Sequence, residues 1–119
     1  MPPCRRVAVR PGVGGAGPAG VRLATGMAAI LHYEYVADIL ERRAPHRATH
    51  LAILSEWYDA GRCLLAGATG DPVSGAALVF ATEEDAFDFV GRDPYVEAGL
   101  VRAHRIEPIA VVVPPPAAG

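Results

Sequence analysis

The chain has no lysine, asparagine or glutamine, so all eleven of its basic residues are arginines. From Met27 onward, seven arginines stand against thirteen acidic residues, which gives this part a formal net charge of −6. A domain this acidic lacks the basic surface that nucleic-acid binding requires, so we expect no nucleic-acid partner. No apolar run approaches the length of a transmembrane helix, so we expect no membrane-spanning segment either.

Cysteine is scarce as well, because Cys4 and Cys63 are the only two and lie in segments of different character. Two such residues make neither a disulfide framework nor a metal knuckle, which favours a reducing compartment such as the cytoplasm. With 119 residues, 51% of them hydrophobic, the chain has room for one domain around a single core.

Residues 1–26 hold four prolines, six glycines and four arginines but no acidic residue. They show no lasting helical or strand periodicity, so we predict a disordered leader. It is interpreted as an organelle-targeting peptide, a flexible native arm, or a stretch upstream of a start at Met27, and these alternatives stay open. A targeting peptide would change the expected compartment from cytoplasm to organelle. The domain is predicted over residues 27–113, and residues 114–119 are predicted to form a disordered tail.

Between these ends, runs of branched and aromatic residues alternate with helical patterns and turn signals. Strands are predicted at 30–35, 63–67, 76–80 and 101–106, with 108–113 extending or following the last one. Helices are predicted from Pro45 to about Ala60 and from Thr82 to Gly91, with a helical turn from Asp93 to Gly99. The connection 38–42 has room for one further helical turn.

This order is β-α-β-β-α-β, the α+β ferredoxin-like arrangement with an antiparallel sheet. Its two helices cover one face of the sheet and leave the other face open. A homodimer that packs sheet against sheet is the simplest way to cover that face.

At 100° per residue, Leu51, Leu54 and Tyr58 form the predicted core-facing stripe of the first helix. His50 lies about 80° from the centre of this stripe, so we expect it at the margin of the buried face. The second strand is expected to be buried. The second helix is expected to bury Ala86, Phe87, Phe89 and Val90.

Histidine and carboxylate side chains are the candidates for chemistry. His46 and His50 are four residues apart on one helix, a spacing that suits a metal, but no third ligand is indicated and we expect no metal. His32 and His104 fall on strands, where hydrogen-bonded sheet positions explain them. A histidine at a core margin, oriented by a carboxylate, makes a general acid or base near neutral pH, and Asp93 is the candidate carboxylate.

Structural roles compete with this hypothesis for both residues. An aspartate before a proline at a helix start is a common N-cap, which alone would explain Asp93. His50, for its part, could simply stack on Trp57.

Several short motifs, taken together, resemble the YCII-related (YciI-like) family and span nearly all of residues 28–113. They are Tyr33-Glu34-Tyr35-Val36, Leu40-Glu41-Arg42-Arg43, Arg47-x-x-His50-Leu51, Gly61-Arg62, Ala66-Gly67 and Asp93-Pro94-Tyr95-Val96-x-Ala98-Gly99-Leu100. The resemblance implies a small dimeric α/β barrel whose characteristic histidine and aspartate correspond to His50 and Asp93. One relative with an assigned reaction eliminates chloride from a lactone ring.

Two functions remain as hypotheses. In the first, a lyase- or isomerase-type enzyme uses His50 and Asp93 for acid/base chemistry on a small anionic lactone or carbonyl compound. Arg43, Arg47 and Tyr95 would then bind the substrate, and no organic cofactor is indicated. In the second, the protein is a non-catalytic dimeric module that binds a small ligand or serves as a scaffold.

Overall fold

The computed structural model describes residues 26–116, so the predictions for residues 1–25 and 117–119 lie outside the described part of the chain. The predicted order of strands and main helices is confirmed, and the short connection before the first long helix contains a helical turn. The elements are β1 (Met27–Tyr35), α1 (Ile39–Arg42), the 3₁₀ turn η2 (Ala44–His46), α2 (Arg47–Asp59), β2 (Cys63–Thr69), β3 (Gly75–Phe80), α3 (Glu83–Arg92), α4 (Pro94–Glu97) and β4 (Val101–Ala110).

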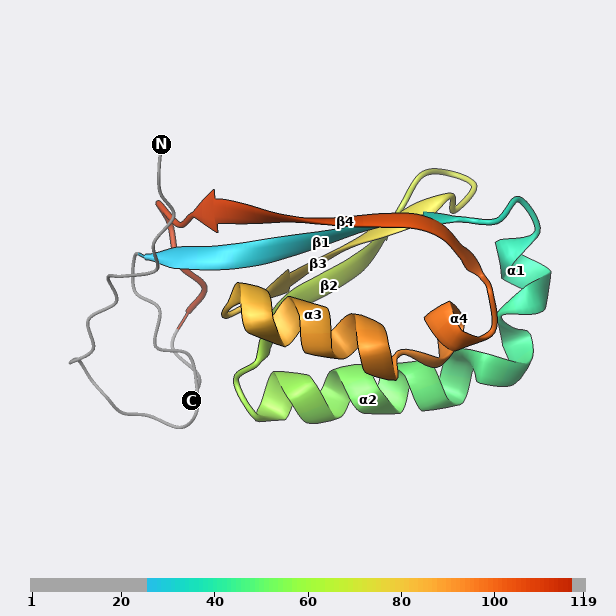
Figure 1. The fold of residues 1–119 in the computed structure, drawn as a ribbon, viewed down its shortest axis with the longest axis horizontal. Coiled ribbons are helices and arrows are strands. Elements are labelled where there is room, and N and C mark those ends of the chain that lie inside the picture. The colour runs from blue at the N-terminus through green and yellow to red at the C-terminus, as the bar shows by residue number, and fades with distance from the viewer. Residues whose placement is uncertain (1–25, 117–119) are drawn as a thin grey trace.

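The four strands form one antiparallel sheet in the order β2-β3-β1-β4. Figure 1 shows all the helices on one side of this sheet, with α2 and α3 side by side and α1 and α4 at one end. The predicted ferredoxin-like α+β fold is therefore confirmed, and the sheet has one helix-covered face and one open face. Among the described residues, no helix combines the length and the apolar character needed to cross a membrane.

Strand β1 runs through the middle of the sheet and supplies much of the core. Its residues at odd positions point toward the helices, and Leu31 pairs with Leu78 of β3 and Ile106 of β4. β1 begins at Met27, three residues before the predicted start. The early part pairs with Pro108–Ala110 at the far end of β4, a distant partner that local composition does not reveal.

The buried side of α2 is not the predicted one. Leu51 is 43% exposed and Tyr58 63% exposed, so two members of the expected stripe face away from the core. The helix is turned by roughly 80° from the predicted orientation, at 100° per residue. Its inward side is formed by His50, Ile53, Leu54 and Trp57.

Two further burial predictions were wrong. β2 was expected to be buried, but it is an edge strand, and Leu65 on its open-face side is 66% exposed. Phe87 was expected in the core and is 63% exposed, because α3 turns Ala86 and Phe89 inward instead.

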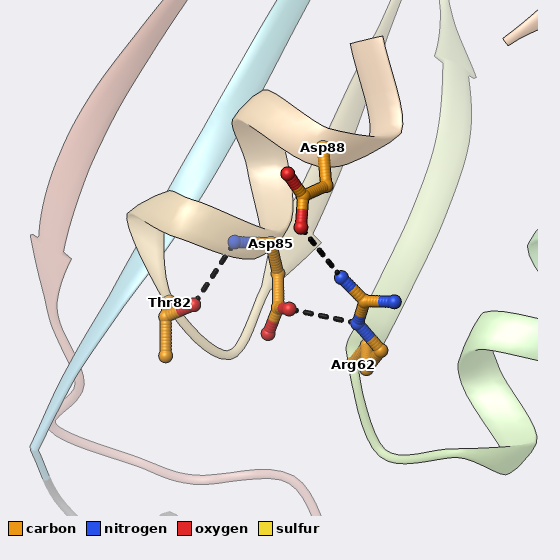
Figure 2. A network of polar contacts seen from close by, with 4 residues as sticks. All are labelled: Arg62, Thr82, Asp85 and Asp88. Carbon is orange, nitrogen blue, oxygen red and sulfur yellow. Dashed lines mark hydrogen bonds and ion pairs between the residues drawn. The ribbon is translucent and has the colours of Figure 1, made fainter. Parts of the chain in front are cut away.

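The turn between α2 and β2 is tied to the start of α3 by Arg62 (Figure 2). Arg62 donates to Asp85 at 2.8 Å and to Asp88 at 3.1 Å, and its guanidinium lies 3.7 Å from the centre of the Trp57 ring. The predicted cap of α3 is confirmed, since the hydroxyl of Thr82 accepts from the backbone N–H of Asp85 at 3.0 Å. This Arg62 network holds α2 and α3 together at the end remote from α4.

Candidate functional site

Asp93 lies between α3 and α4, where the chain changes direction. Its extended backbone ends α3, and Pro94 occupies the first helical position of α4, where a missing N–H costs nothing. One carboxylate oxygen, Oδ1, accepts from the backbone N–H of Tyr95 at 3.0 Å, so the predicted capping role is confirmed. The turn closes at Gly99, whose φ of 77° favours glycine.

The side chains of His50 and Asp93 meet in the fold, 43 residues apart in the sequence. Nδ1 of His50 lies 2.8 Å from Oδ1 of Asp93, so the expected approach is confirmed. His50 is only 6% exposed and Asp93 only 1% exposed. The histidine is thus part of the buried face, not at its margin, because the carboxylate satisfies its polar edge.

Tyr33 is a third residue of the site, and the sequence analysis did not predict it. Its hydroxyl donates to Oδ2 of Asp93 at 2.7 Å. The alternation of β1 places this side chain on the helix-covered face, and its presence in the Tyr-Glu-Tyr motif was the available signal. The buried Asp93 carboxylate therefore accepts three hydrogen bonds, from Tyr33, His50 and the backbone of Tyr95.

These contacts assign the tautomer of His50. Burial raises the pKa of Tyr33 far above its ordinary value, and the charge of Asp93 and their hydrogen bond raise it further, so the phenol remains a donor. With two fixed donors on it, Asp93 is the acceptor in this network, and we assign the proton between Nδ1 of His50 and Oδ1 to Nδ1. The lone pair of the neutral ring is therefore on Nε2.

Tyr95 packs flat against the imidazole, with ring centres 3.8 Å apart and planes 4° apart. This stacking partner differs from the predicted one, because Trp57 packs on Phe80 and Phe89 instead. Within residues 26–116, the Tyr95 hydroxyl is the one enclosed side-chain polar atom without a hydrogen-bond partner. A buried unpaired hydroxyl is costly, so it marks a point where a further polar group would be accommodated.

Nε2 of His50 forms no hydrogen bond with any described residue. It is not among the enclosed polar atoms that lack a partner, so it keeps some contact with the exterior. The stacked rings thus carry two unpaired polar atoms, the basic nitrogen of His50, which keeps contact with the exterior, and the enclosed hydroxyl of Tyr95. Together they could act on a molecule that carries both an acidic proton and an oxygen.

Arg43 and Arg47 form no hydrogen bond or ion pair with His50 or Asp93 among the described residues. Their charges act on Tyr35, a neighbour of both Tyr33 and Tyr95, with ring centres 5.8 Å and 6.0 Å away. Burial raises the pKa of Tyr35 most, Asp93 and Tyr95 raise it further, and the two arginines lower it. The arginines therefore supply positive charge on the side of Tyr35.

The remaining candidates form no second site. His32 bonds to Glu107 at 2.8 Å on the sheet. His46 joins no metal cluster, since residues 26–116 contain no group of three or more His, Cys, Asp or Glu side chains placed to hold a metal. Cys63 is buried, and that burial raises the pKa of its thiol to about 11, which keeps it unreactive.

Two solved structures share this fold. One is 5-chloro-2-hydroxyhydroquinone dehydrochlorinase from Burkholderia phenoliruptrix in complex with 2,5-dihydroxybenzoquinone, 24% identical, with a TM-score of 0.57 over 67% of this chain and 90% of that one. The other is a protein of unknown function from Nitrosomonas europaea, 17% identical, with a TM-score of 0.52 over 80% of this chain and 97% of that one. At such identities the likeness shows the fold alone.

No curated protein matches the sequence. The profile of the YCII-related domain, a family whose members are typically dimers, matches residues 27–110. Within residues 26–116, that span includes every strand, every helix and the whole His50–Asp93 site. The chain therefore belongs to the YCII-related family.

Proposed function

We propose that the protein is a small lyase- or isomerase-type enzyme in which His50 and Asp93 carry out acid/base chemistry on a small anionic lactone or carbonyl compound. The observation that carries this proposal is the buried 2.8 Å pair, with its basic nitrogen Nε2 unpaired and open to the exterior. A neutral histidine held in one tautomer by a carboxylate is suited to remove a proton near neutral pH.

In this mechanism Nε2 of His50 takes a proton from carbon next to the substrate carbonyl. Asp93 stabilises the imidazolium that forms, because their hydrogen bond becomes an ion pair when the ring is charged. The unpaired hydroxyl of Tyr95, which the entering ligand would have to uncover, donates to the carbonyl oxygen, where negative charge develops. Arg43 or Arg47 neutralises the anionic group of the substrate from the side of Tyr35.

The dehydrochlorinase with the same fold supports this class of reaction. Loss of hydrogen chloride requires a base for the proton and an environment that tolerates charge on the remaining oxygenated ring. The molecule in that structure, 2,5-dihydroxybenzoquinone, is small, planar and rich in oxygen. The stacked rings of Tyr95 and His50 offer the flat surfaces on which a planar ligand of this kind would pack.

A non-catalytic module is the second candidate, and one observation favours it. The carboxylate of Asp93 is enclosed and already accepts three hydrogen bonds, as expected of a group that only joins β1, α2 and α4. In that case His50 and Asp93 would be needed for stability, and no ligand would depend on Nε2.

A ligand screen by thermal shift separates the two candidates. We expect 2,5-dihydroxybenzoquinone or a small lactone carboxylate to raise the melting temperature of the wild type but not that of His50→Ala. His104→Ala is the matched control, because it removes an exposed histidine from β4 and should keep the response. Ligand-induced shifts that survive in a folded His50→Ala protein would contradict the enzyme proposal.

Turnover gives the second readout. Loss of the substrate's absorbance or release of chloride from a chlorinated ring should be seen with the wild type, and should fall by about 100-fold or more in His50→Ala. Asp93→Asn tests the charge, since an amide keeps an oxygen for the Tyr95 cap but cannot stabilise an imidazolium. Equal turnover by the wild type and both variants would contradict the enzyme proposal and leave the non-catalytic module as the remaining candidate.

We also propose a homodimer formed by the open sheet face. Leu65, Val79 and Ile30 are neighbours in the β2-β3-β1 register, and they lie on the face opposite to the buried Leu31 and Leu78. This row of apolar side chains on the face without helices is what a second sheet would cover.

Light scattering tests the dimer. The wild type should have twice the mass of one chain, and Val79→Arg should give monomers because it buries an unpaired charge in the interface. Tyr58→Arg is the control, since Tyr58 is a large hydrophobic side chain that is 63% exposed but lies on α2. A monomeric wild type, or a dimer lost only with Tyr58→Arg, would contradict the open-face dimer.

A further inference from the structure

The hydroxyl of Tyr33 occupies the carboxylate oxygen of Asp93 that His50 does not use. Oδ2 accepts from Tyr33 at 2.7 Å, while Oδ1 accepts from His50 at 2.8 Å and from the Tyr95 backbone at 3.0 Å. The phenol is 60 residues from Asp93 in the sequence and comes from the central strand, so its position is fixed by the sheet. Each oxygen of the buried carboxylate thus has at least one donor.

We propose that Tyr33 is a positioning residue that holds Asp93 in its ionised form and thereby keeps His50 available as a base at Nε2. The proposal rests on the acid/base function proposed above and names a further residue for it. Tyr33 would touch no substrate, and its effect would pass through Asp93.

The physical argument concerns what would happen if Asp93 took up a proton. A proton on Oδ2 would compete with the Tyr33 hydroxyl, which makes no other hydrogen bond within residues 26–116, and a proton on Oδ1 would leave that hydroxyl on a neutral carbonyl oxygen. A neutral acid is a weaker acceptor than a carboxylate, so the phenol disfavours the protonated acid. An ionised Asp93 in turn requires the proton of His50 to stay on Nδ1, which leaves the lone pair on Nε2.

Removing the hydroxyl should therefore change how tightly the His50–Asp93 pair holds a proton. Without the Tyr33 donor the carboxylate is less stabilised, so the pair takes up a proton more readily and titrates at higher pH. The other titratable groups around the pair are Tyr95 at the start of α4 and Tyr35 on β1, with positive charge from Arg43 and Arg47. None of these donates to Oδ2.

The test is an NMR titration of the His50 ring in the full-length protein, with no ligand present. In Tyr33→Phe we expect the midpoint to rise by about one pH unit, a tenfold change in proton affinity. Tyr35→Phe is the matched control, because it removes a phenol from the same face of β1 that makes no hydrogen bond to Asp93. It should leave the midpoint within about 0.2 units.

Two further variants test the same role of Tyr33 independently of Tyr33→Phe alone. Replacing Tyr33 by 3,5-difluorotyrosine makes the phenol a stronger donor in the same shape, so the midpoint should move to lower pH even if Tyr33→Phe folds poorly. In an Asp93→Asn background, Tyr33→Phe should cause no further shift, because the residue through which Tyr33 acts has lost its charge.

An unchanged midpoint in Tyr33→Phe, or an equal rise in Tyr35→Phe, would overturn the proposal. The readout needs no substrate, so its failure is distinct from failure of the proposed function. A shifted midpoint in a protein that turns over nothing would leave the role of Tyr33 intact and refute the enzyme. If ligand binding depends on His50 but Tyr33→Phe leaves the midpoint unchanged, the proposed function stands and the role of Tyr33 is refuted.

Discussion

Two polar networks join the helices to the rest of the domain, the Arg62 network (Figure 2) and the His50–Asp93 network next to α4. The Arg62 network is partly open to solvent, with side-chain exposures of 36% for Arg62, 18% for Asp85 and 59% for Asp88. The network at the other end is enclosed, with 7% for His50 and 0% for Asp93.

The networks also differ in what they leave unpaired. Arg62 is permanently charged, and two carboxylates and the Trp57 ring surround it, so this end needs nothing further. At the site, Nε2 of His50 and the hydroxyl of Tyr95 have no partner among the described residues. Burial without complete satisfaction is expensive, which is why the site end is the better candidate for function.

The largest expected difference follows from removing one carboxylate at each end. Asp93→Ala deprives Tyr33 and His50 of their acceptor and uncaps α4, so the free energy of unfolding should fall by about 3–5 kcal/mol. Asp85→Ala should cost at most about 1 kcal/mol, since water replaces the partner of Arg62. Urea denaturation measures both, and equal losses would remove the distinction between the two ends.

Alkaline pH probes a weak acid at each end, Cys63 beside Arg62 and Tyr33 beside Asp93. Burial raises both pKa values, that of Cys63 to about 11, so the folded protein holds these protons more tightly than the unfolded chain. Their stabilisation is present at neutral pH and is lost as the pH rises, for Cys63 between about 9 and about 11.

The measurement is urea denaturation at several pH values across that window. Cys63→Ala should start less stable than the wild type but lose less stability as the pH rises. If the two proteins lose stability in parallel, the thiol does not contribute.

The two networks should also differ in how their contribution to stability depends on ionic strength. Arg62→Ala should lower the free energy of unfolding by about 1–2 kcal/mol at low ionic strength, from two half-exposed ion pairs and a cation–π contact. In about 1 M sodium chloride the loss should shrink, because exposed charges are screened. The cost of Asp93→Ala should hardly depend on salt, since that network is enclosed. A salt-independent Arg62→Ala would indicate that packing on Trp57 dominates.

The smallest effect is expected from the cap of α3. Thr82→Ala removes the hydroxyl that accepts from the Asp85 backbone and should cost about 1 kcal/mol. Thr49→Ala is the control, because this exposed threonine lies inside α2, where alanine is the better helix former. Thermal melts of the two variants should separate them, and equal melting temperatures would mean that the cap is replaced by water.

The order of strands and helices was predictable because its signals are local. Alternation in β1, the threonine cap at Thr82 and the Asp93-Pro94 helix start each depend on neighbouring residues. Orientation was less predictable. Leu51 and Tyr58 were expected inside, because a helical wheel counts a histidine as polar and ignores the distant carboxylate that allows His50 to be buried.

For the site, the sequence named His50, Asp93 and Tyr95, and the structure brings these three together. Tyr33 was missed because a tyrosine on a strand is equally consistent with a purely hydrophobic core position. Its partner Asp93 is also 60 residues away in the sequence. Whether Arg43, Arg47 and Tyr95 bind a substrate stays a prediction.

The sequence by itself determined the β-α-β-β-α-β order, the cap at Asp93 and the family motifs, since each is written in residues that are close in the chain. Only the tertiary structure decided which side of α2 is buried, which face of the sheet is open, and that Tyr33 completes the hydrogen bonds of Asp93. The physical reason is that burial and hydrogen-bond satisfaction depend on partners brought from elsewhere in the chain. No local pattern specifies those partners.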